Sequence, residues 1–324
     1  MPEMSKKHLI FIVGFFAVVC ADAGAVMLSL DDALRATYQA CVGIDEELSD
    51  LKKMAGINTF TTAVGTGLGI GAMATGISKA KIDETLAQKY QDMSDLSYAA
   101  SSDVETISEE DFVSKVATAL NNRISGNSNN NDEEKQRLQN EINNLENKSK
   151  RLGKWRTGLL AGNTVTNVAG AVIAGNNHVK KTLQEQIDDC KSSVRNLKDA
   201  ILRAKYEGQD ISEASHIQSV CGGFEYVDID KINKRATGAM VSSVVGAGTG
   251  VVGTITSALA NSKNIRDDDT VDGRVKEQNL NTASNILATG STVASASATI
   301  FNATQIKAIK DVASVAQQCS EVLK

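Results

Sequence analysis

The sequence predicts an all-α protein made of two long helical hairpins, each closed by a disulfide. Three observations predict it. The only proline among 324 residues is Pro2, so very long helices are permitted. Four cysteines lie at spacings typical of helical seams, and four proposed helices each carry a charge-free window rich in Gly, Ala, Ser and Thr. Together they predict an antiparallel four-helix bundle or coiled coil with a small-residue central slab.

Residues 1–25 have the features of a secretory signal peptide. Two lysines precede an apolar run, 9–20, that is too short for a typical membrane span, and small residues at 21 and 23 suit cleavage. Cys20 offers lipidation as an alternative, although Val19 is larger than lipidation signals usually carry before the cysteine. The segment predicts export to the periplasm or cell envelope, or secretion, and therefore an oxidising compartment.

The four later cysteines predict two pairs, Cys41–Cys190 and Cys221–Cys319. The second pair is symmetric about residue 270, in a turn-like acidic run, and the first becomes equally symmetric once the polar stretch 91–141 is set aside. Apolar residues around positions 41, 190 and 319 alternate in steps of three and four, so these cysteines face a partner helix. Facing seam positions come within the ~4.4–6.8 Å Cα separation that a disulfide needs. Four buried free thiols are the alternative, which suits an exported chain less well.

This pairing predicts the domain organisation. After the signal peptide come a first hairpin at 26–207, with an inserted head at 91–141, a linker at 208–223 and a second hairpin at 224–324. Inside the head, an apolar stripe over 112–124 and a low-complexity turn at 125–132 precede a heptad run that leads into the second window.

The charge-free windows lie at 54–78, 157–179, 236–262 and 278–306. As helices they are about 35–43 Å long at 1.5 Å per residue. Each lies at a similar distance along the chain from its nearest hairpin-closing cysteine, so all four are expected to form one slab.

Small residues recur at every fourth position within the windows. Such stripes let two helix backbones approach closely, and they resemble the glycine zippers of membrane proteins. The glycines expected to pack helices together are Gly67, Gly71, Gly158, Gly162, Gly170, Gly246, Gly250 and Gly290.

The slab has two interpretations. The first is a membrane location. Glycine costs up to about 1 kcal/mol in an exposed helix interior, so close packing or lipid is needed to hold such helices, and a helix without charge on any face is usually buried or in a membrane. Against a membrane location, the windows are only mildly apolar, with Asn163 and Asn167 in the second and many Ser and Thr in the fourth. A soluble bundle of tightly packed small-residue helices therefore stays open.

Composition argues against several functions. Net charge is −5, with 34 basic and 39 acidic residues well mixed, so no basic face predicts nucleic-acid binding. Cys/His spacings typical of zinc sites are absent from the sequence, and no catalytic constellation or cofactor motif is found. His178 is expected to be a polar border residue. Trp155, just before the second window, marks either a membrane interface or an ordinary helical seam.

The sequence thus predicts an exported, non-enzymatic helical envelope protein that needs no cofactor or metal. It is expected to associate with or insert into membrane through glycine-zipper helices, with lipid or further copies of itself as partners and self-assembly or pore formation as extensions of that role. The alternative is a soluble periplasmic or secreted coiled-coil module that binds a protein partner through the head at 91–141.

Overall fold

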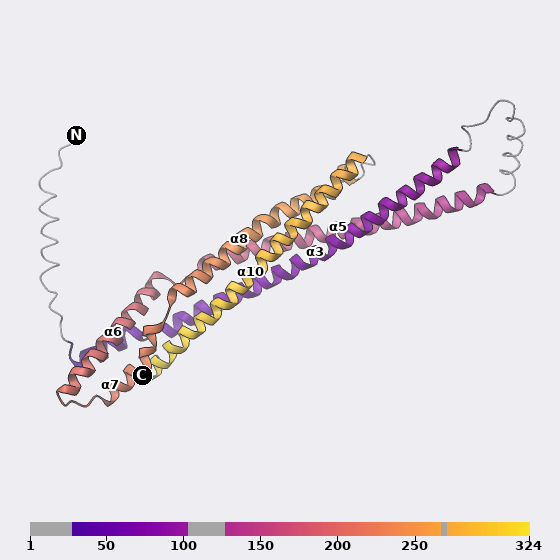
Figure 1. Cartoon of the computed structure of the whole chain (residues 1–324). Coiled ribbons are helices and arrows are strands. Elements are labelled where there is room, and N and C mark those ends of the chain that lie inside the picture. The colour runs from indigo at the N-terminus through magenta and orange to yellow at the C-terminus, as the bar shows by residue number, and fades with distance from the viewer. Residues whose placement is uncertain (1–27, 103–126, 267–270) are drawn as a thin grey trace, which may run out of the picture. The chain divides into compact units, whose positions relative to one another are not determined.

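The computed structural model describes residues 28–102, 127–266 and 271–324, and every element in those ranges is a helix (Figure 1). The elements are α2 (Leu30–Cys41), α3 (Ile44–Ser102), α5 (Asn127–Asn176), α6 (Lys181–Tyr206), α7 (Ser212–Cys221), the 3₁₀ helix η1 (Gly222–Tyr226), α8 (Ile229–Ala260), α9 (Lys263–Arg266) and α10 (Val271–Leu323). The all-α prediction is confirmed for these residues. The predicted signal peptide at 1–25 and the apolar stripe over 112–124 lie outside them.

Long uninterrupted helices follow from the lack of proline. α3 has 59 residues and α10 has 53. Breaks occur where the backbone needs a conformation that glycine adopts without strain: Gly43, between α2 and α3, has φ 89°, and Gly208, after α6, has φ 74°. Asp210 accepts hydrogen bonds from the backbone nitrogen and hydroxyl of Ser212 at 3.0 and 2.7 Å, and these bonds lower the pKa of its carboxyl group.

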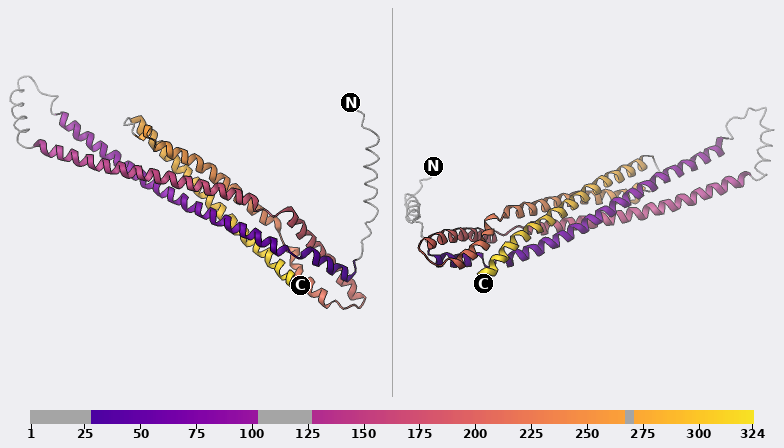
Figure 2. Two further views of the ribbon diagram at one scale, coloured as in Figure 1. Left: turned by 180° about the vertical axis from the view of Figure 1, so that it is seen from behind. Right: turned by 60° about the horizontal axis from the view of Figure 1, so that its bottom comes forward.

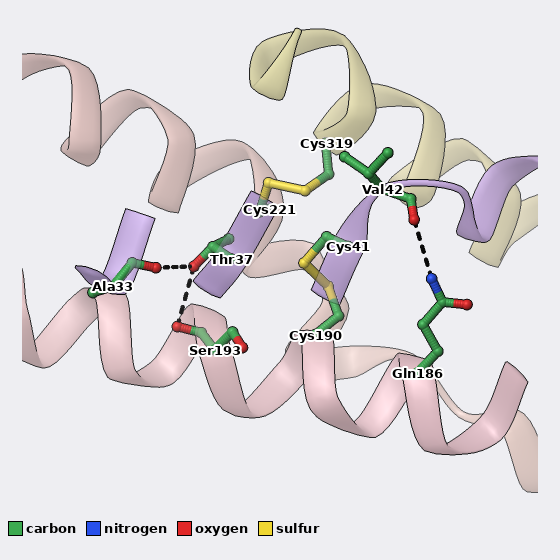
Figure 3. Close-up of a disulfide and its surroundings, with 9 residues drawn as sticks. All are labelled: Ala33, Thr37, Cys41, Val42, Gln186, Cys190, Ser193, Cys221 and Cys319. Carbon is green, nitrogen blue, oxygen red and sulfur yellow. Dashed lines mark hydrogen bonds between the residues drawn. A yellow bond between two sulfur atoms is a disulfide. The ribbon is translucent and has the colours of Figure 1, made fainter. Parts of the chain in front are cut away.

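Both predicted disulfides are confirmed. The Cα atoms of Cys41 and Cys190 are 4.9 Å apart, and those of Cys221 and Cys319 are 4.7 Å apart. All four cysteines are fully buried. Figure 3 shows the two bridges among α2, α6, α7 and α10. These disulfides indicate an oxidising environment.

Contacts divide the described chain into two compact units. Unit 1 contains residues up to 53, 179–233 and 306–324, and unit 2 contains 54–178 and 234–305. This division places the start of α3 and the end of α10 in unit 1 and all of α5 in unit 2. The division into hairpins at 26–207 and 224–324 follows chain order and stays a prediction.

Unit 1 packs as a water-soluble protein does. α6 buries its apolar stripe, which includes Leu183, Ile187 and Leu197, while its charged residues point outward. Across the interface with α2, the Thr37 hydroxyl donates to the carbonyl of Ser193 at 3.3 Å (Figure 3). Apolar burial and two disulfides therefore hold this unit together.

Unit 2 contains the four glycine-rich windows. Here α3, α5, α8 and α10 run beside one another in each view of Figures 1 and 2. α3 and α5 continue together past the other two, joined by Tyr90, whose hydroxyl donates to Glu146 at 2.5 Å, and by a Lys89–Glu141 ion pair at 3.1 Å.

Candidate membrane-contacting region

Apolar side chains are exposed along all four windows of unit 2, although the α10 window also exposes Gln278, Asn279, Thr282 and Thr289. We call the following set the apolar exterior: Ile57, Phe60, Ile70 and Ile77 on α3; Val165, Val168 and Val172 on α5; Val241, Val244, Val245, Val251, Val252, Ile255 and Leu259 on α8; and Ile286, Val293, Ile300 and Phe301 on α10. Phe60 is 73% exposed and Val165 is 67% exposed. From 54 to 77 on α3, from 157 to 175 on α5 and from 240 to 259 on α8, every exposed residue is apolar or glycine.

Polar side chains fill the space between the same helices. We call the buried set Asn58, Thr62, Asn163, Asn167, Ser291, Ser295 and Asn302 the polar core. Its members come from α3, α5 and α10. Between these windows, unit 2 buries polar side chains beside small apolar ones such as Ala72 and Ala288, whereas the interior of unit 1 is mainly aliphatic.

Hydrogen bonds join the centre of the polar core. The Asn163 amide donates to the Ser291 hydroxyl at 2.9 Å, and the Asn167 amide donates to the Asn163 carbonyl oxygen at 3.0 Å. Ser295 donates to Asn167 Oδ1 at 2.9 Å. Ser291 donates to the backbone carbonyl of Gly246 at 2.8 Å, which ties α8 into the same network.

A second group of hydrogen bonds connects α3 and α10. The Asn58 amide donates to Asn302 Oδ1 at 2.9 Å, and Asn302 donates to the Thr62 hydroxyl at 3.4 Å. Further along, the Gln305 amide donates to the backbone carbonyl of Asn177 at 2.9 Å. Buried polar groups are costly unless they are paired, so these hydrogen bonds lower the cost of the polar interior, although Asn58 Oδ1 and Ser243 Oγ have no partner among the described residues.

Glycines in unit 2 make room for polar side chains of facing helices. A Cβ atom added at Gly246 would lie 2.9 Å from the side chain of Asn167, and one added at Gly250 would lie 2.5 Å from Thr164 Oγ1. At Gly170 it would lie 2.9 Å from Thr62 Cγ2 and 3.1 Å from Ser243 Oγ. The nearest atoms belong to side chains, whereas the zipper interpretation expects backbones in close approach.

The other glycines singled out from the sequence lie in more open surroundings. An added Cβ at Gly162 would lie 3.1 Å from Leu68 Cδ1, whereas at Gly71 and Gly290 the nearest atoms are 3.4 and 3.8 Å away. At Gly67 and Gly158 it meets nothing within 4 Å. Since both are exposed, Gly67 and Gly158 are not contact residues of the described fold.

The glycines expected from the sequence to pack helices together did not include Gly65 and Gly69. An added Cβ would lie 2.5 Å from Thr166 Oγ1 at Gly65 and would collide with Thr292 at Gly69. The signal was present, because Gly65 and Gly69 are also four residues apart.

A buried charged cluster lies at one end of the windows. Lys79, 2% exposed, contacts Asp83 at 2.7 Å and Glu277 at 3.0 Å. Ser149 donates to the second oxygen of Asp83 at 2.6 Å. Arg156, 1% exposed, donates to the backbone carbonyl of Asn281 at 3.3 Å. The two cations balance the two carboxylates in charge. Lys79, Arg156 and Glu277 each lie one residue outside a window, and Asp83 lies further along the polar arm of α3.

His178 and Trp155, at the two ends of the second window, have different surroundings. His178 contacts the Thr237 hydroxyl at 3.0 Å and the carbonyl of Gly175 at 3.2 Å, in a polar layer at the end of the second window. Trp155 is 64% exposed, so it is not a seam aromatic. An exposed tryptophan beside an apolar surface is typical of a membrane interface.

By length and composition, helical stretches at 30–95, 133–176 and 212–260 are able to cross a membrane. α10 is not among them, because its window contains the polar side chains that point inward, while Ile286, Val293 and Ile300 face outward. Among the described residues, no group of His, Cys, Asp and Glu side chains is arranged to hold a metal ion.

No protein-family model, curated protein or solved structure matches this chain.

Proposed function

We propose that this chain is an exported, non-enzymatic envelope protein whose unit 2 inserts into a membrane through the apolar exterior. The observation that carries the proposal is the distribution of polarity: the α3, α5 and α8 windows expose Val, Ile, Leu and Phe, while the four windows together bury Asn, Ser and Thr beside alanine. In water this arrangement loses apolar burial and desolvates polar groups. In lipid it is favourable, since polar side chains then hydrogen-bond between helices.

The exterior favours lipid over a single protein partner. All four helices contribute exposed apolar residues, and we infer that the windows form an antiparallel four-helix bundle, in which outward faces point to different sides. A protein partner covers one side of such a bundle, whereas lipid surrounds it. The exposed apolar stretch of α3, 54–77, is about 35 Å long as a helix, enough for a hydrocarbon core of about 30 Å.

Chain order supports the same proposal. If each window crosses a membrane once, residues up to 53, 180–235 and 307–324 lie on one side, and all four disulfide-forming cysteines fall within those segments. Both disulfides then share one oxidising compartment, as an exported protein requires. The polar arms of α3 and α5 lie on the other side.

Self-assembly is a second part of the proposal. Gly67 is exposed among apolar neighbours and has free space above it, so a second copy can approach closely there. Since hydrogen bonds among Asn163, Asn167, Ser291 and Ser295 join helices across the centre of the polar core, we place any pore between copies rather than within one.

Membrane fractionation tests the proposal. We expect the mature protein to remain in the membrane pellet after a sodium carbonate wash and to float with liposomes. Complete release into the supernatant, with no flotation, would contradict insertion and favour the soluble coiled-coil module that binds a partner through the head.

A further inference from the structure

We propose that an exposed basic stripe on α5 binds the headgroups of anionic phospholipids at the edge of the apolar exterior. The stripe consists of Lys148, Arg151 and Lys154, followed by Trp155. This inference rests on the proposed membrane insertion and adds the class of lipid and its binding site.

The stripe lies on one face of the helix. Lys148, Arg151 and Lys154 follow one another at intervals of three residues, which keeps them on neighbouring turns of the same side. All three are exposed, and Trp155 extends the same surface toward Val165. The stripe ends at the start of the second window. In the proposed membrane-inserted state, this is the depth at which lipid headgroups meet the hydrocarbon core.

The positive charges of the stripe are uncompensated within the described part of the chain. No ion pair joins Lys148, Arg151 or Lys154 to another described residue, whereas two nearby acids are engaged: Glu141 pairs with Lys89, and Glu146 accepts from Tyr90. Three free cations within two turns attract an anionic surface.

The stripe ends beside an open patch of surface on the same helix. The residues of this patch are Lys154, Trp155, Gly158 and Leu159. Gly158 leaves the space open, since nothing lies within 4 Å of the position of a Cβ atom there. Lys154 supplies a charge for a lipid phosphate, and Trp155 and Leu159 supply apolar contact for the glycerol and upper acyl chain.

Vesicle partition of the full-length protein tests the site. The test variant combines Lys148→Gln, Arg151→Gln and Lys154→Gln. The matched control combines Arg195→Gln, Lys198→Gln and Lys205→Gln, which removes the same charge from exposed positions of α6 in unit 1 that form no ion pair with described residues. Both proteins are compared with the wild type on phosphatidylcholine vesicles and on vesicles that also contain phosphatidylglycerol.

We expect the wild type and the control to prefer the phosphatidylglycerol vesicles, and the test variant to lose about tenfold or more of that preference while still binding phosphatidylcholine. The inference is overturned if the wild type shows no preference, if the test variant keeps it, or if the control loses it equally. It is also overturned if inorganic phosphate at constant ionic strength abolishes the preference, because the ligand is then a free anion. Failure to bind either vesicle overturns membrane insertion itself, so the two failures are distinguishable.

Discussion

At the scale of single residues, unit 2 pairs most of its buried glycines with a polar side chain from another helix, with Gly253, which faces Leu287, as an exception. Gly246 faces Asn167, Gly250 faces Thr164, and Gly170 faces Thr62. The glycine removes volume, and the amide or hydroxyl uses that volume to reach hydrogen-bond partners. This pairing explains why both residue types are frequent in the same windows.

Replacing an inward glycine is expected to destabilise the protein. Gly246→Ala places a methyl group against the Asn167 side chain, and we expect a loss of about 1–3 kcal/mol, as in other overpacked sites. Gly158→Ala is the control: with open space above it, alanine stabilises the helix by about 0.4–1 kcal/mol. Thermal unfolding in detergent measures both. Equal shifts of the two variants would show that Gly246 is not a contact residue.

The hydrogen-bond network makes a second prediction at this scale. Asn163→Leu leaves Asn167 Nδ2 and the Ser291 hydroxyl without the partner they have in the wild type, and we expect a destabilisation of about 1–3 kcal/mol. Val165→Leu, two residues later on the exposed face, is expected to be neutral within about 0.5 kcal/mol. Unfolding of the two variants in the same detergent provides the comparison, and an unchanged Asn163→Leu would refute a structural role for the polar core.

At the scale of helices, the average composition of a helix does not show which residues lie on its inward face and which on its outward face. α10 carries Ser291, Ser295 and Asn302 in its window, so its mean hydropathy is low, but these three side chains point inward. On the exposed face of the same window, Ile286, Val293 and Ile300 lie among the exposed threonines Thr282 and Thr289. Mean hydropathy therefore does not show how apolar and polar residues are divided between the two faces of a helix.

A charge on an outward face is expected to separate lipid from water as the surroundings of unit 2. Val168→Glu adds a carboxylate near the middle of the α5 window, which costs about 2.5–3.5 kcal/mol in a bilayer. We expect a reduction of roughly 100-fold in carbonate-resistant association. Leu202→Glu is the control, since Leu202 is 51% exposed on α6 of unit 1. If the two variants fractionate alike, the exterior of unit 2 does not contact lipid.

Two features of the helices could be predicted from sequence because each depends on local pattern. Lack of proline predicts long helices, and the three-four spacing around Cys41 and Cys190 places both on facing seams. Pairing of the cysteines then follows from the symmetry of each hairpin. These are the parts of the fold that the structure confirms.

The inward face of each window could not be predicted in the same way. Gly65 and Gly69 form one four-residue stripe on α3, and Gly67 and Gly71 form another, about 200° away around the helix. Spacing alone cannot decide which stripe faces a neighbour, because that depends on how the helices are rotated in the assembled unit. For the same reason, Asn163 counted against a membrane location until its burial was known.

At the scale of the whole molecule, one chain combines two kinds of packing. Unit 1 buries aliphatic side chains and is closed by two disulfides, whereas unit 2 buries amides and hydroxyls and exposes aliphatic side chains. Under the proposed function, this contrast reflects two different surroundings, water for unit 1 and lipid for unit 2. This contrast is the central claim of the proposed function.

Fluorescence quenching by brominated lipids tests that claim most directly, because Trp155 is the only tryptophan. In liposomes, we expect Trp155 to be quenched best by bromines near the headgroups. In the double variant Trp155→Phe, Val165→Trp, the tryptophan moves about 15 Å along α5, to the middle of a bilayer core of about 30 Å, so bromines deep in the acyl chains are expected to quench best. The control Trp155→Phe, Leu202→Trp, with its tryptophan in unit 1, is expected to be unquenched. Val165→Trp fluorescence that no brominated lipid quenches would contradict the account.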